Sequence, residues 1–268
     1  MRRFIVISAL LLASASILTN CNGSKKLGSG INIFPMEQDR ALGAQVAAEI
    51  DGNPKEYPLL DSASNKEVYQ YLYKIRNNIL NSGQVKHKDD FAWRLRIIHN
   101  DSTLNAFCTP GGYIYVYTGI LKFLDNEAEL AGVLGHEIAH ADFRHSTRQM
   151  TQMYGVEALL AIVAGNRQQL SQITAGLIGL KFSRNHEAEA DHGSVTYLCP
   201  TVYQADGGAG FFEKINAAGG SRTPEFLSTH PNPENRIEAF KNYKIELACQ
   251  GVNDFASEYK RIMAKLPK

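Results

Sequence analysis

Apolar side chains recur every three or four residues over much of this chain, and that spacing predicts helices. The clearest example is the set Val68, Leu72, Ile75 and Ile79, which falls at i, i+4, i+7 and i+11 on one helical face. We expect further helices over residues 36–50, 126–143, 150–182, 187–198, 211–217, 234–240 and 256–264. The chain is therefore expected to be mainly helical.

Two short segments alternate instead and predict strands. Apolar and arginine residues alternate over residues 93–97, and residues 113–117 read Tyr-Ile-Tyr-Val-Tyr, a run of aromatic and β-branched side chains. The sequence Pro110-Gly111-Gly112 between them is typical of a turn. Helices with so few strands predict an α+β fold that contains a small antiparallel sheet.

The N-terminus has two positive charges before a short apolar run. Arg2 and Arg3 precede residues 4–18, which are apolar or small throughout. This run is shorter than the about 20 residues that span a bilayer, and it fits a secretory signal peptide over residues 1–20. Cys21 resembles the lipidated cysteine of a bacterial lipobox, followed by a tether to residue 35. The alternative is an ordinary cleaved signal with an incidental cysteine.

Composition and charge add limits to this picture. The 268 residues are 44% hydrophobic and carry a net charge of +1, which suits globular structure and gives no indication of nucleic-acid binding. Export would leave Cys108, Cys199 and Cys249 in an oxidising compartment. Three cysteines allow at most one disulfide, whose pairing the spacing leaves open, and the absence of CxxC spacing argues against a cysteine-ligated zinc.

The segment His136-Glu137-Ile138-Ala139-His140 has the pattern HExxH. On a helix the two histidines share one face, where both imidazoles can bind a single zinc ion. Glu137 would then lie next to the metal site as a general base for water. Because the surrounding positions are apolar, the helix is expected to be buried, and buried His and Glu side chains need partners.

A catalytic zinc requires a third protein ligand. The extended pattern HExxHxxGxxH is excluded because Phe143 and Ser146 occupy the required positions, and His145 is one position away. A second candidate is the segment 183–191, in which Glu187 and Asp191 lie four residues apart on one helical face. Glu187 could bind the metal while Asp191 orients a ligand imidazole. The alternatives are an acidic solvent-facing helix, or ligation by the neighbouring His186 or His192, which lie off this face.

These segments together resemble the bacterial HtpX/BepA-like zinc metallopeptidases, a group that includes the Oma-type and CAAX prenyl proteases. The resemblance extends from about residue 37 to residue 239. Its motifs are Asn105-Ala106-Phe107, Pro110-Gly111-Gly112, the HExxH helix, Ser183-Arg184 with Glu187 and Asp191, and Thr229-His230-Pro231 followed by Arg236-Ile237. It implies a zincin-like metallopeptidase domain over residues 36–268, with the small sheet beside the HExxH helix.

The resemblance also implies roles for individual residues. Glu187 would be the third ligand of one Zn²⁺ per chain, Asp191 would support a ligand histidine, and His230 would be able to sit on the zinc and close the site. Arg236 could stabilise the oxyanion or pair with an acid. The strand containing Tyr113, Ile114 and Tyr115 would be the active-site edge, to which a substrate adds as an extended strand.

The function expected from these residues is a zinc-dependent endopeptidase of the bacterial cell envelope. Zinc-activated water, with Glu137 as general base, would hydrolyse unfolded or misassembled proteins at the periplasmic face, where a lipid on Cys21 would anchor the chain to the outer membrane. One alternative is a gated or latent zinc protein that acts mainly as a chaperone in outer-membrane protein assembly. Another is an exported zinc enzyme that acts on a non-peptide amide.

Overall fold

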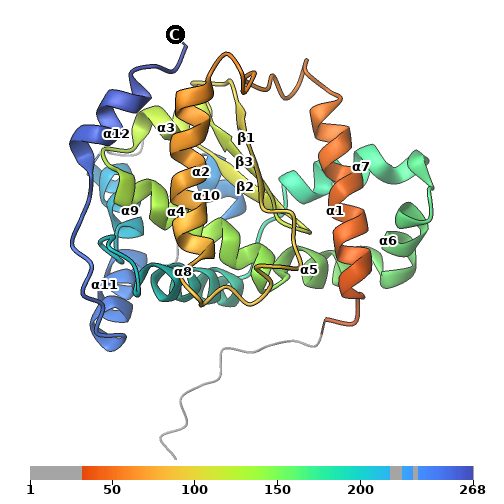
Figure 1. Ribbon diagram of the computed structural model, residues 1–268. Coiled ribbons are helices and arrows are strands. Elements are labelled where there is room, and N and C mark those ends of the chain that lie inside the picture. Colours follow the sequence, from red (N-terminus) through yellow and green to blue (C-terminus); the bar gives the residue numbers. More distant parts are fainter. Residues whose placement is uncertain (1–31, 218–224, 232–234, 268) are drawn as a thin grey trace, which may run out of the picture.

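The computed structural model describes residues 32–217, 225–231 and 235–267. Its helices, shown in Figure 1, are α1 (Met36–Asp51), α2 (Lys66–Leu80), α3 (Thr118–Phe123), α4 (Glu127–Asp142), α5 (His145–Tyr154), α6 (Val156–Val163), the 3-10 turn η1 (Arg167–Gln169), α7 (Leu170–Ile178), α8 (Arg184–Leu198), α9 (Gly208–Ala217), α10 (Glu225–Thr229), α11 (Arg236–Glu246) and α12 (Ala256–Met263). The strands are β1 (Arg94–Ile98), β2 (Ala106–Thr109) and β3 (Tyr113–Tyr117). The predicted α+β class is confirmed. The expected helices are present, but residues 150–182 are divided among α5, α6, η1 and α7 and are not helical after Ile178. The sequence did not predict α3, α10 or β2. The signal peptide, Cys21 and nearly all of the tether lie outside the described residues.

Polar side chains set the starts of the two helices that carry the HExxH motif and the acidic segment. The Asn126 side chain accepts a hydrogen bond from the Glu129 N–H at the start of α4. The Ser183 side chain likewise accepts from the His186 N–H at the start of α8. Each cap satisfies a backbone donor that the helix itself cannot satisfy. These caps fix where each helix begins and thus which residues face inward.

The sheet has the order β1-β3-β2 and is mixed, so the expected antiparallel sheet is wrong in one pairing. β2 and β3 pair antiparallel through the turn at Gly111 and Gly112, whose φ angles of 72° and 82° suit glycine. β1 pairs with β3 in parallel. The alternation over residues 93–97 predicted a strand but carried no information on its partner or direction. As a result β3 is the central strand, and β2 is at the edge.

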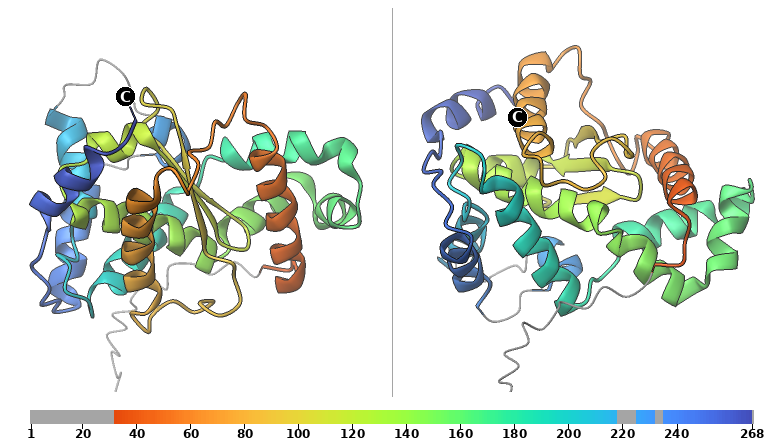
Figure 2. Two further views of the ribbon diagram at one scale, coloured as in Figure 1. Left: turned by 45° about the horizontal axis from the view of Figure 1, so that its top comes forward. Right: turned by 60° about the horizontal axis from the view of Figure 1, so that its bottom comes forward.

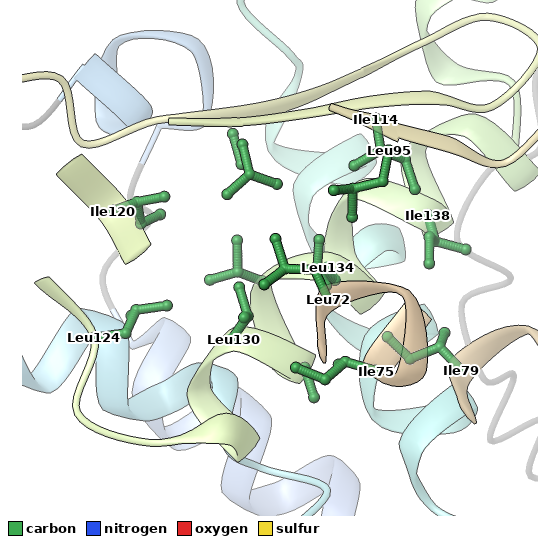
Figure 3. Packing of buried hydrophobic residues seen from close by; sticks show 14 of the residues in the cluster. Leu72, Ile75, Ile79, Leu95, Ile114, Ile120, Leu124, Leu130, Leu134 and Ile138 are labelled. Atoms are coloured by element: carbon green, nitrogen blue, oxygen red, sulfur yellow. The ribbon is translucent and has the colours of Figure 1, made fainter. Parts of the chain in front are cut away.

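Side chains on the two faces of the sheet enter two separate cores. On one face, Leu95 and Ile114 pack with Leu72 of α2 and Leu134 of α4; Figure 3 shows this packing at close range. On the other face, Tyr115 and other side chains pack with residues of α1, α6 and α7. Figure 2 shows the sheet between α2 on one side and α1 on the other. One face of the sheet thus packs against α4, and every residue of α4 is buried.

Other features bear on the predictions about cysteines and membranes. Cys199, which follows α8, is bonded to Cys249 across 50 residues of sequence, and Cys108 is free and buried. The limit of one disulfide is therefore confirmed. Among the described residues, no helix combines the length and apolarity that crossing a membrane requires.

Candidate metal centre

Four buried side chains bring potential metal ligands within 4.8 Å of one another: His136, His140, Glu187 and His230. The Nε2 atoms of His136 and His140, one turn apart on α4, are separated by 3.0 Å. The Glu187 carboxylate on α8 lies 3.5 Å from His136 Nε2 and 3.4 Å from His140 Nε2. His230 Nδ1 lies 3.2 Å from His136 Nε2 and 3.1 Å from Glu187 Oε1. Spacing along α4 and the packing of α8 against α4 therefore bring together the two histidines and the glutamate that the sequence predicted.

The chemistry of this cluster fits zinc. Imidazole nitrogens and one carboxylate are ordinary zinc ligands. Glu187 Oε2 is buried and accepts no hydrogen bond of suitable geometry within the described structure, although the Arg236 guanidinium lies beside it. Burial opposes ionisation of Glu187, but nearby His230, His140 and His136 hold its carboxyl pKa well below the usual range. Burial lowers the pKa of His140 well below its ordinary value, which favours the neutral ring that a metal needs.

Asp191 supports His136 from the side opposite the cluster. Its Oδ1 atom lies 2.8 Å from His136 Nδ1, which leaves Nε2 directed at the other ligands. Arg236 holds Asp191 in turn, with its Nε donating over 2.8 Å to Oδ2, and its Nη1 lies 3.1 Å from Glu187 Oε2. Of the two roles considered for Arg236, the structure shows pairing with acids.

Glu137 follows His136 on the same helix and lies beside the cluster without belonging to it. Its Oε1 atom is buried, has no hydrogen-bond partner among the described groups, and is 3.5 Å from His230 Nε2. Burial raises the pKa of the Glu137 carboxyl, an effect that the neighbouring His230 and His136 oppose. A carboxylate so placed can accept a proton from water at the site.

The structure excludes the two rival histidines from the ligand cluster. His186 stacks on His145 with ring centroids 4.4 Å apart, and His192 packs edge-on against Tyr243. His145, which sequence reasoning set aside, instead contacts a ligand: its Nδ1 lies 2.9 Å from His140 Nδ1. Nothing in the helical spacing of the HExxH motif indicated this contact.

His230 is held in the cluster by aromatic packing. Phe226 of α10 stacks on its ring with centroids 4.4 Å apart, and Phe182 lies on it at 5.4 Å. The Phe226 N–H also donates over 3.0 Å to the Leu104 carbonyl, just before β2. The segment that carries His230 is therefore attached to the chain leading into the edge strand.

The predicted substrate edge at Tyr113, Ile114 and Tyr115 is wrong in position. β3 is paired with β1 on one side and with β2 on the other, so its backbone has no free edge. The Ile114 side chain is in the core, and the Tyr115 hydroxyl donates to Asp51. The sequence could not reveal that β3 is central, because the alternation that predicts β1 does not say which strand β1 pairs with.

Comparisons with known proteins match the chain to metallopeptidases. The chain matches the model of peptidase family M48 over residues 67–244. A protein of Escherichia coli K12 named metalloprotease YcaL is 28% identical over 255 residues, which cover 87% of this chain and 96% of that protein.

Two longer relatives match over part of their length. The mitochondrial metalloendopeptidase OMA1 of Arabidopsis thaliana is 32% identical over 213 residues, covering 78% of this chain and 42% of that protein. The beta-barrel assembly-enhancing protease of Escherichia coli K12 is 31% identical over 162 residues, covering 54% of this chain and 33% of that protein. The chain thus spans nearly all of the first relative and less than half of these two.

Proposed function

Because the chain belongs to peptidase family M48, whose members are zinc-dependent metallopeptidases, we propose that it is an envelope endopeptidase that hydrolyses misfolded or misassembled proteins. The observation that carries this proposal is the placement of Glu137 beside the cluster of His136, His140 and Glu187. That arrangement provides a metal site and a separate proton acceptor within one buried centre.

Each residue of the site has its own role in the proposed hydrolysis. Zinc held by His136, His140 and Glu187 would supply Lewis acidity toward a peptide carbonyl and toward water. Glu137 takes a proton from the water as the water oxygen bonds to the carbonyl carbon. Glu137 then returns that proton to the amine nitrogen as the C–N bond breaks. Asp191 keeps the His136 ring in the orientation that metal binding requires.

His230 makes the described arrangement a closed one. A zinc site with four protein ligands is typical of structural zinc, whereas catalytic zinc keeps one position for water or substrate. With Nδ1 inside the ligand cluster, His230 would occupy the position that water or substrate needs when zinc is bound. We therefore propose that the chain is a latent peptidase, opened when the segment carrying His230 withdraws.

Substrate would bind along β2 instead of β3. The Tyr117 N–H donates to the Asn105 carbonyl, so alternation along an antiparallel strand directs the backbone groups of Ala106 and Cys108 away from β3. This edge passes Glu137, on which the Cys108 backbone acts by hydrogen bonding, and the Ala106 N–H donates to the Asn105 side chain. Both donors would have to be released for a peptide to pair with β2. A peptide added there by main-chain hydrogen bonds would present its carbonyls to the metal centre with little sequence preference.

The closed site also supports a second candidate function, that of a binding protein. With His230 in place, the chain could hold unfolded outer-membrane proteins without cleaving them. One relative is named a beta-barrel assembly-enhancing protease, a name that joins assembly and proteolysis in one protein. The retained Glu137 favours the peptidase, because binding alone requires no buried proton acceptor.

The proposed location rests on the N-terminal pattern. Residues 1–20 would direct export, and a lipid on Cys21 would attach the protein to the periplasmic face of the outer membrane. Radiolabelled palmitate incorporation tests this directly. We expect labelling of the wild type and none of Cys21→Ala, and equal labelling of both would refute the assignment.

The decisive experiment measures casein degradation and bound zinc for wild type, Glu137→Gln and His230→Ala. We expect one equivalent of zinc in each protein, faster cleavage by His230→Ala than by wild type, and none by Glu137→Gln. Unchanged cleavage in Glu137→Gln would refute the general-base assignment. Zinc-loaded proteins that all fail to cleave casein and other unfolded substrates would favour the binding protein, and a wild type without zinc would refute the metal site.

A further inference from the structure

The two ligand histidines differ in what supports them. His136 contacts a carboxylate directly, since Asp191 lies 2.8 Å from its Nδ1. The Nδ1 atom of His140 instead faces another imidazole, His145, at 2.9 Å. His145 is fully buried, and its second nitrogen, Nε2, lies 2.9 Å from Glu189 Oε2. A continuous hydrogen-bonded series therefore connects a ligand of the metal to a carboxylate outside the cluster.

Metal binding fixes the direction of every proton in this series. His140 Nε2 faces Glu187 and must keep its lone pair for the metal, so its ring proton resides on Nδ1. His140 Nδ1–H can then donate only to an unprotonated His145 Nδ1. His145 consequently carries its proton on Nε2 and donates it to Glu189. The carboxylate selects one tautomer of His145, and His145 selects one tautomer of His140.

Backbone geometry and a cation hold this series in place. Arg144 has a φ of 58°, and this left-handed turn between α4 and α5 directs His145 back toward His140. Arg148, one turn later on α5, places its Nη2 atom 3.6 Å from Glu189 Oε2. Successive contacts on this side thus run from Arg148 through Glu189 and His145 to His140. On the other ligand they run from Arg236 through Asp191 to His136.

We propose that His145 and Glu189 are positioning residues for the zinc ligand His140, a role that the HExxH pattern does not indicate. One helix, α8, thus supplies the ligand Glu187 and the carboxylates that support both ligand histidines. Glu189 lies off the Glu187 and Asp191 face, and His145 bridges the intervening distance. The inference rests on the zinc site of the proposed function and not on its peptidase activity, so zinc affinity tests it separately.

The experiment measures zinc affinity of the full chain by competition with a chromogenic chelator. His145→Phe keeps an aromatic ring but removes the acceptor, and we expect zinc binding to weaken by about 10- to 100-fold. In His145→Asn the amide oxygen lies near the former Nδ1 position and can accept from His140, so most of the affinity should return. His186→Phe is the matched control, because His186 stacks on His145 but lies outside the series.

If His145 acts through packing alone, His145→Phe should bind zinc more tightly than His145→Asn, since phenylalanine fills the site and asparagine does not. The proposal would be overturned if the zinc affinity of His145→Phe were within about twofold of wild type. It would also be overturned if the zinc affinity of His145→Asn were no higher than that of His145→Phe. If His145→Phe does not fold, as judged by circular dichroism, Glu189→Leu and Glu189→Gln decide. We expect loss of affinity in Glu189→Leu and retention in Glu189→Gln, whose amide oxygen still accepts from His145; equal affinities would overturn the proposal.

Discussion

Gly135 on α4 lies in direct contact with Ser194 on α8: a Cβ atom placed on Gly135 would be 2.7 Å from Ser194 Oγ and 3.3 Å from its Cα. These two helices carry His136, His140 and Glu187, so their separation sets the size of the metal site. The absence of a side chain at position 135 is thus a requirement of the site as well as of the fold.

The first prediction follows from this contact. Gly135→Ala should force α4 and α8 apart, at a cost of about 1–3 kcal/mol for overpacking, of which the better helix propensity of alanine offsets at most ~1 kcal/mol. Zinc affinity should fall together with stability. Urea unfolding and chelator competition measure both quantities.

Ser194→Ala provides the control for that prediction. It removes the closest clashing atom, Ser194 Oγ, which otherwise donates to the Gly132 carbonyl over 2.8 Å. In a double-mutant cycle, Gly135→Ala should be less damaging in the Ser194→Ala background. Strictly additive effects would show that the contact does not limit the approach of the helices.

The second prediction concerns the disulfide between Cys199 and Cys249, which links the end of α8 to the segment after α11. Closing a loop of 50 residues restricts the unfolded chain. Removing the disulfide in Cys199→Ser/Cys249→Ser should therefore lower the free energy of unfolding by about 2–4 kcal/mol. Urea titration with and without reductant checks this, and reductant should not affect the double variant. Cys108→Ala should keep the full sensitivity to reductant, because Cys108 forms no disulfide.

The third prediction separates the two roles considered for Arg236. Its guanidinium contacts Asp191 and Glu187 and is buried with them. Arg236→Ala should therefore lower stability by about 3–5 kcal/mol, the usual cost of leaving buried charges unpaired, and zinc affinity should fall. Arg236→Lys should restore little, since one ammonium cannot match a guanidinium that reaches both acids. If kcat fell while zinc affinity and stability stayed at wild-type values, the oxyanion role would be correct instead.

Periodicity alone predicted much of this molecule. Helical spacing identified the α2 face, and the same rule paired His136 with His140 and Glu187 with Asp191. Such predictions succeed because residues three or four apart on a helix share a face regardless of the rest of the fold. The role of His230 came from the resemblance to known metallopeptidases, which also supported the role of Asp191. The structure places His230 in the cluster and Asp191 against His136.

What the sequence did not predict depends on contacts between distant segments. The central position of β3 follows from a parallel pairing with β1, and alternation carries no information about a partner. The bridge from Glu189 to His140 requires His145 on a different helix, reached by a left-handed turn at Arg144. Helical spacing treats each helix separately, so it gives Glu189, which lies off the Glu187 and Asp191 face, no partner at the metal site.

The last prediction concerns the removal of zinc. A ligand that binds only the folded chain stabilises it by about 2.7 kcal/mol at a free concentration of 100 times Kd. The wild type should therefore melt at a higher temperature with zinc than after chelation. Glu187→Gln should lose most of this difference because a ligand is replaced, whereas Glu137→Gln should keep it because Glu137 lies outside the ligand cluster. Calorimetry of the three proteins with and without zinc measures these differences. Loss of the zinc effect in Glu137→Gln would make that residue a ligand and would leave the site without its proton acceptor.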